Sequence, residues 1–130
     1  MSSIVTAMNH FTILTDDVQR TSTFYRDILG LSEGYRPPLS IPGVWLYAGN
    51  NAILHVVGGS TREQLKPGVI DHMAFSAAGL NEALARLAAR NIAHDCRRQA
   101  ESGVWQVFFH DPNGARIELD FGAHETLSRS

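Results

Sequence analysis

The chain has 130 residues, of which 44% are hydrophobic and 18% are charged, and its formal net charge is −2. This length predicts a single domain, and the near-balanced charge argues against nucleic acid or a membrane surface as a partner. No apolar stretch approaches the roughly 20 residues that a membrane-spanning helix needs, and the N-terminus lacks the features of a signal peptide. The single cysteine, Cys96, excludes an intramolecular disulfide and fits a cytoplasmic protein.

The first half of the chain predicts a strand, a helix and three further strands. A β-rich segment over residues 8–15 ends at Asp16-Asp17, which can cap the start of a helix. This helix is expected to continue to about Leu29 and to stop at Gly30. The three strands are predicted over residues 32–36, 44–48 and 51–57, the last two joined by a tight turn.

The second half repeats this order. A strand (residues 70–77) and a helix (80–90) are followed by strands over 92–98, 104–110 and 115–121. His72 follows His10 by 62 positions and Glu118 follows His55 by 63, so one small insertion aligns the two copies. We expect one α+β domain over residues 1–130. Its parts are module 1 (8–57), a linker (58–69), module 2 (70–121) and a frayed tail (122–130), and each module has the order βαβββ.

Side-chain alternation along the strands predicts a shared polar face. On the last strand Ile117 and Leu119 point to one face, and Glu118 points to the other. The same parity places three histidines on the face that the helices leave open: His10, His55 and His72. His10 and His72 are equivalent in the repeat, and so are His55 and Glu118.

Imidazole and carboxylate groups in this arrangement suit a divalent metal ion. His10, His72 and Glu118 form a two-histidine, one-carboxylate set, which leaves positions open for water and substrate. Such ligands accept iron, manganese, nickel, cobalt or zinc, and the sequence does not choose among them. Arg116 shares the face of Glu118 and is a candidate for binding a substrate carboxylate, although it can equally pair with an acid or point to solvent.

Four segments of the chain resemble one protein superfamily. They are Asn9-His10-Phe11, residues 24–31 of the first helix, residues 71–75, and the Asp-Pro-Asn-Gly segment that leads to Glu118. Together they resemble the vicinal-oxygen-chelate superfamily of glyoxalase I, extradiol dioxygenases, methylmalonyl-CoA epimerase, fosfomycin-resistance transferases and bleomycin-binding proteins. The resemblance implies that the two modules pair into a U-shaped, barrel-like mixed sheet, with the helices outside and one divalent metal site in the cavity.

The resemblance also implies a metal ligand set of His10, His55, His72 and Glu118. His55 is a departure, because glyoxalase I-like members have at that position a glutamate that also acts as the base. His55 can serve as a base near neutral pH, or as a fourth ligand. His55 and Glu118 are therefore the candidate catalytic residues. Small members of the superfamily commonly dimerise, sometimes with sites shared between subunits, so we expect a homodimer.

Three functions are compatible with these residues. The first is a metal-dependent lyase or isomerase of the glyoxalase type, which stabilises an enediolate or related oxyanion of a small oxygenated substrate. The second is an Fe(II) extradiol-type dioxygenase that uses His10, His72 and Glu118. The third is a ligand-binding or resistance protein without chemistry, against which the complete ligand set argues.

Overall fold

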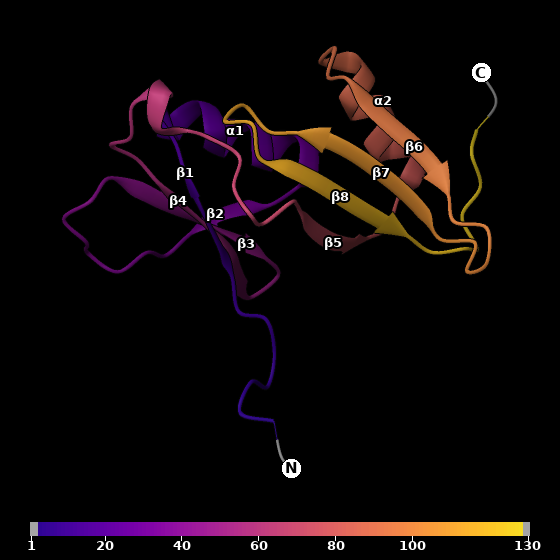
Figure 1. The fold of residues 1–130 in the computed structure, drawn as a ribbon, viewed down its shortest axis with the longest axis horizontal. Helices are drawn as coiled ribbons and strands as arrows, with labels where there is room; N and C mark the ends of the chain where they lie inside the picture. Colours follow the sequence, from indigo (N-terminus) through magenta and orange to yellow (C-terminus); the bar gives the residue numbers. More distant parts are fainter. Residues whose placement is uncertain (1–2, 129–130) are drawn as a thin grey trace.

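The computed structural model describes residues 3–128, which form two four-stranded mixed sheets and two α-helices (Figure 1). The first sheet has the order β1-β4-β3-β2, and the second has the order β5-β8-β7-β6. The strands of the first sheet are β1 (Phe11–Leu14), β2 (Ser32–Gly34), β3 (Gly43–Ala48) and β4 (Asn51–Val57). Those of the second are β5 (Met73–Ala77), β6 (His94–Arg98), β7 (Trp105–His110) and β8 (Arg116–Phe121). The predicted α+β fold class is confirmed.

The two modules repeat each other in topology and in register. In each sheet the outer strand that precedes the helix runs parallel to the last strand of its module, and the other pairs are antiparallel. Thr12 lies opposite His55 in the first sheet, and Ala74 lies opposite Glu118 in the second. The register therefore places His55 and Glu118 at equivalent points of the two sheets. No strand of one sheet pairs with a strand of the other among residues 3–128, so these strands form no closed barrel.

Local signals set the bounds of α1 (Val18–Leu29), which the sequence predicts well. The side chain of Asp17 accepts a hydrogen bond from the backbone N–H of Arg20 at 3.0 Å and so caps the first turn. Gly30 ends the helix with φ +73°, a left-handed conformation that glycine adopts without strain. No helix in the described part of the chain is long and apolar enough to cross a membrane.

The C-terminal tail was expected to be frayed, and for residues 122–128 this prediction is wrong. The carboxylate of Glu125 accepts hydrogen bonds from the backbone N–H groups of Gly79 and Leu80 and so caps α2 (Leu80–Ala89). The indole of Trp105 donates to the backbone carbonyl of Glu125 at 2.8 Å. The residue that precedes the helix, Gly79, has no side chain to cap it, and the tail supplies the missing acceptor. The last two residues of the predicted tail lie outside the described residues.

The modules are joined through the buried side of α1. Tyr25 donates a hydrogen bond to the Asp111 carboxylate at 2.7 Å, and Asn113 bonds both Thr15 and Thr21. The Asp111 carboxylate also accepts hydrogen bonds from backbone N–H groups within its own turn between β7 and β8. The first helix is thus fastened to a turn of the second module by a buried polar network. Such a network fixes the relative position of the two modules, because a buried polar group that lost its hydrogen bond would destabilise the fold.

Replacing Tyr25 by phenylalanine is expected to lower the free energy of unfolding by about 1–3 kcal/mol, because a buried carboxylate loses a donor. Burial first, and then the charge of Asp111, raise the pKa of Tyr25 well above its ordinary value. The unfolded tyrosine ionises at a pH of about 10 while the folded one keeps its proton, so each further pH unit should remove up to about 1.4 kcal/mol of stability. Urea unfolding at neutral and alkaline pH measures both effects.

Tyr47→Phe is the control, because the hydroxyl of Tyr47 donates to the backbone carbonyl of Tyr35 at an exposed site. We expect a smaller loss of stability at neutral pH for this variant than for Tyr25→Phe. Equal losses in the two variants would show that the hydroxyl of Tyr25 does not join the modules. If Tyr25→Phe lost as much stability at alkaline pH as the wild type does, the pH dependence could not be assigned to Tyr25.

Candidate metal centre

The first pair of candidate residues lies on the open face of the first sheet. His10 and His55 stack with their ring centroids 3.7 Å apart, and His55 stacks on Trp45 at 3.9 Å. Trp45 lies opposite His55 in the register between β3 and β4, so the stack follows from neighbouring strands. Burial first, and then the charge of His10, lower the pKa of His55 below its ordinary value. His55 therefore keeps a free lone pair at neutral pH.

The second pair lies on the open face of the second sheet. Nε2 of His72 is 3.1 Å from Oε1 of Glu118. Nδ1 of His72 is 2.8 Å from a carboxylate oxygen of Asp71, and the same oxygen accepts a hydrogen bond from Arg116 at 2.9 Å. Hydrogen bonds from His72 and Arg116 lower the pKa of Asp71, so this group is a carboxylate that can only accept. Nδ1 of His72 must donate to it, which turns Nε2 toward Glu118.

Glu118 is buried, with 7% of its surface exposed. Neighbouring groups stabilise its ionised form. Gln106 donates to its other oxygen at 3.2 Å. A hydrogen bond from Asp120 is the largest influence that lowers the pKa of Glu118. Burial and the neighbouring Glu118 raise the pKa of Asp120 to about 6. Glu118 is therefore ionised at neutral pH, whereas Asp120 takes up a proton only as the pH falls to about 6.

In both modules the residue before the histidine holds the imidazole ring through its side chain. His10, like its equivalent His72, has Nδ1 within hydrogen-bond distance of the side chain that precedes it, here the amide oxygen of Asn9 at 2.7 Å. An outer carbonyl or carboxylate that binds one ring nitrogen fixes the orientation of the imidazole and directs the other nitrogen outward, as is usual for metal-binding histidines. The sequence argument missed these roles of Asn9 and Asp71. The signal was present, because both residues belong to the repeated motif.

The structure describes two half-sites rather than one complete site. The half-sites lie on separate sheets (Figure 1), and residues 3–128 contain no group of three or more His, Cys, Asp or Glu side chains placed to hold one metal ion. Each pair, His10 with His55 and His72 with Glu118, is brought together as the strand register requires. Arg116, the candidate for substrate binding, pairs with Asp71 in the second half-site.

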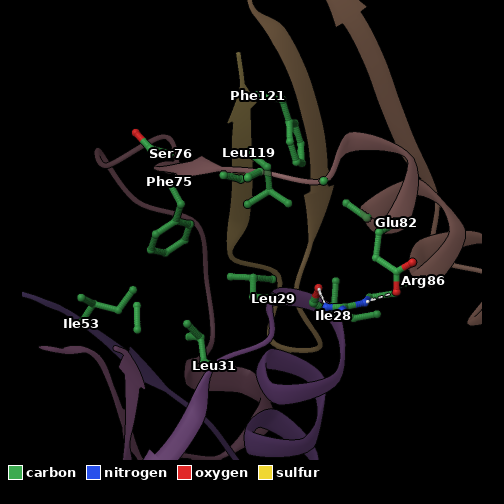
Figure 2. Close-up of a pocket in the computed structure, with 15 residues that line it drawn as sticks. Ile28, Leu29, Leu31, Ile53, Phe75, Ser76, Glu82, Arg86, Leu119 and Phe121 are labelled. Carbon is green, nitrogen blue, oxygen red and sulfur yellow. Dashed lines mark hydrogen bonds and ion pairs between the residues drawn. The ribbon is translucent and has the colours of Figure 1, made fainter. Parts of the chain in front are cut away.

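A partly open pocket of about 310 Å³ lies elsewhere, between the end of α1, β5 and α2 (Figure 2). Its walls are mainly apolar, with Ile28, Phe75 and Leu119 among them. The two charged residues in its lining, Glu82 and Arg86, bond each other at 3.2 Å, as Figure 2 shows. This pocket contains none of the candidate metal ligands, so we do not assign the chemistry to it.

Comparison with known proteins now identifies the family. Residues 7–119 match the model of the Glyoxalase/Bleomycin resistance protein/Dioxygenase superfamily. The chain belongs to this superfamily. The resemblance noted from the sequence motifs is confirmed.

Individual relatives agree with this assignment. The chain is 29% identical over 123 residues to Glyoxylase I 4 of Arabidopsis thaliana, which covers 88% of this chain and 70% of that protein. Its fold is similar to that of the fosfomycin resistance protein FosX of Listeria monocytogenes in a complex with Mn(II) and a dihydroxypropylphosphonic acid. That match has a TM-score of 0.74 and 17% identity, and it covers 92% of this chain and 94% of the other.

A further structure of this fold is the glyoxylase/bleomycin resistance protein/dioxygenase domain from Frankia sp. EAN1pec. Its TM-score is 0.73 at 19% identity, and the match covers 94% of this chain and 96% of the other. At these identities the two solved structures establish the fold alone.

Proposed function

We propose that this protein is a divalent-metal-dependent enzyme that acts on a small oxygenated substrate by lyase or isomerase chemistry of the glyoxalase type. The observation that carries the proposal is the His72–Glu118 pair with Asp71 behind it. In this pair an ionised carboxylate and an outward-facing imidazole nitrogen approach to 3.1 Å, and only a proton or a cation can lie favourably between them. A metal-binding protein of the same fold, FosX with Mn(II), supports the proposal.

The donor atoms fit a divalent ion. Ligands about 2.1 Å from one ion at neighbouring positions lie about 3 Å apart, close to the separation of His72 and Glu118. We assign His10, His72 and Glu118 as ligands and His55 as an auxiliary group that can bind the ion or accept a proton. The bound ion would supply a Lewis acid that stabilises negative charge on substrate oxygens. Iron, manganese, nickel, cobalt and zinc all accept this donor set.

The half-sites are completed in this proposal by a second copy of the chain. Met8 and Ile70, which immediately precede the two equivalent motifs, are both 72% exposed. The segment before β1 also exposes Ile4 and Val5 and extends away from the sheets (Figure 1). Apolar surface beside both half-sites is expected where another subunit packs. A two-fold homodimer would bring the first half-site of one chain to the second half-site of its partner, and would do so twice.

In this proposal each residue of the site has a separate role. Asn9 and Asp71 hold the two imidazoles in the orientation that binding requires. Glu118 provides the negative charge that balances the cation. Neutral His55, held between His10 and Trp45, is placed to take a proton from a substrate C–H bond that neighbours a carbonyl group.

Exchange of such a proton is the test. Protein reconstituted in turn with each of the five metals is incubated with α-hydroxycarbonyl compounds in D₂O, and deuterium incorporation is followed by NMR. We expect metal-dependent exchange in the wild type and in the control His94→Ala, whose ring bonds the carbonyl of Ile92 away from both half-sites. His72→Ala should abolish it. Exchange that persists in His72→Ala would refute the site, and oxygen consumption with catechols in the iron-loaded protein would favour ring cleavage instead.

A further inference from the structure

Two guanidinium groups flank one aromatic ring beside the second half-site. The ring of Phe108 lies 4.7 Å from the guanidinium carbon of Arg97 and 4.6 Å from that of Arg116. The ring centroids of Phe108 and His72 are 6.2 Å apart. Phe108 lies opposite Glu118 in the pairing of β7 with β8. The two cations are therefore neighbours of the candidate metal ligands.

The two arginines differ in what neutralises them. Arg116 forms an ion pair with Asp71 at 2.9 Å, so its charge is met within the half-site. Arg97, on β6, takes part in none of the side-chain hydrogen bonds or ion pairs found among residues 3–128. Its planar group is held on Phe108 while its N–H donors stay available. An arginine stacked in this way loses less freedom when it binds, because its orientation is already restricted.

The next residue on the same strand shows how a structural arginine of this chain is satisfied. Arg98 also stacks on an aromatic ring, that of Trp105, at 4.7 Å. Its guanidinium, however, donates to the backbone carbonyls of Gly103 and Ala123. Successive residues of a strand point to opposite faces, so Arg98 lies on the other side of the sheet from Arg97. Arg98 therefore stabilises the fold, whereas Arg97 faces the second half-site.

We propose that Arg97 binds an anionic group of the substrate, a carboxylate or a phosphonate, while other oxygens of the same substrate reach the metal centre. This inference rests on the proposed function and narrows it to anionic substrates. A guanidinium offers two parallel N–H donors to two oxygens of one anion, which fits both carboxylate and phosphonate groups. Phe108 acts as the platform that holds the donors beside His72 and Glu118.

The test compares ligands that share a vicinal diol and differ in charge. Manganese-loaded protein is titrated by calorimetry with 1,2-dihydroxypropylphosphonate, with glycerate and with neutral 1,2-propanediol. We expect Arg97→Gln to weaken binding of the anionic ligand that fits by about 10–100-fold, as expected for loss of charge-assisted hydrogen bonds, and to leave the neutral diol unaffected. The control Arg98→Gln removes the same charge on the other face and should leave both affinities unchanged.

A second measurement needs no metal. In chelator-treated protein labelled with ¹⁵N, the Nε–H signal of Arg97, assigned by its loss in Arg97→Gln, should shift on addition of inorganic phosphate or acetate, and the response of each anion shows which source is preferred. An unmoved Arg97 signal, or equal weakening by Arg97→Gln and Arg98→Gln, would overturn the anion site even if the metal binds as proposed. A shifted signal in a protein that binds no metal would preserve the anion site while refuting the proposed function.

Discussion

Replacing Glu118 by alanine is expected to remove the metal from the protein. Glu118 is the only anionic member of the proposed ligand set, and without it the charge of a divalent ion is no longer balanced locally. Loss of an outer partner of a ligand costs about 10–100-fold in metal affinity, and loss of the ligand itself should cost at least as much. The measurement is metal content per chain after dialysis, by elemental analysis, with circular dichroism to show that the variant is folded.

The matched variant is His55→Ala, which should keep most of the metal and lose turnover. Three other groups still hold the ion, whereas the neutral imidazole between His10 and Trp45 is gone. Glu118→Gln retains a similar shape and the capacity to accept from Gln106, so it separates loss of charge from loss of packing. An emptied site in His55→Ala together with a filled site in Glu118→Ala would show that ligand and auxiliary group are assigned the wrong way round.

Much of the fold follows from sequence because periodic signals govern each element separately. The alternation Ile117-Glu118-Leu119 predicts which face is buried, and in the structure Ile117 and Leu119 are in the core. The repeated Asn9-His10 and Asp71-His72 motifs predict equivalent strands, and the pairing register agrees. These features depend on neighbours within one module, where strand pairing leaves little freedom.

Other features depend on contacts that no local pattern encodes. Glu125 caps α2 from 45 residues away, so its role could not be predicted from the tail alone. The buried bond from Tyr25 to Asp111 spans 86 positions. Alternation along a strand assigns His10 and Glu118 to open faces, yet it does not determine whether those faces meet within one chain or between two. The distance between half-sites is set by packing of whole modules, a property outside strand periodicity.

Family membership says less about the reaction than the candidate metal ligands do. The same superfamily name covers glyoxalases, resistance proteins and dioxygenases, so function has to be argued from the site. Here the argument depends on a neutral His55 on one sheet and an ionised Glu118 on the other. These two groups can act on one substrate only if the open faces of the two sheets lie against each other. The reaction therefore depends on how the two half-sites assemble.

A mixture of two inactive chains is expected to recover activity if a second copy completes each site. His10→Ala breaks the first half-site and Glu118→Ala breaks the second. In their heterodimer one site combines both defects, while the other joins an intact His10 to an intact His72 and Glu118. Heterodimers isolated with two different tags should therefore show about half of the wild-type activity and bind about one metal ion in place of two.

The control heterodimer joins His72→Ala to Glu118→Ala, which both damage the second half-site. Neither of its sites is intact under the shared arrangement, so no recovery is expected. If the sites lay within single chains, the first heterodimer would stay as inactive as its parents, since each chain would carry one broken site. Sedimentation of the wild type would also reveal a dimer under the shared arrangement, because apolar residues such as Met8 and Ile70 need a partner to cover them. Recovery in the first heterodimer and none in the control would place His10 of one chain beside Glu118 of its partner.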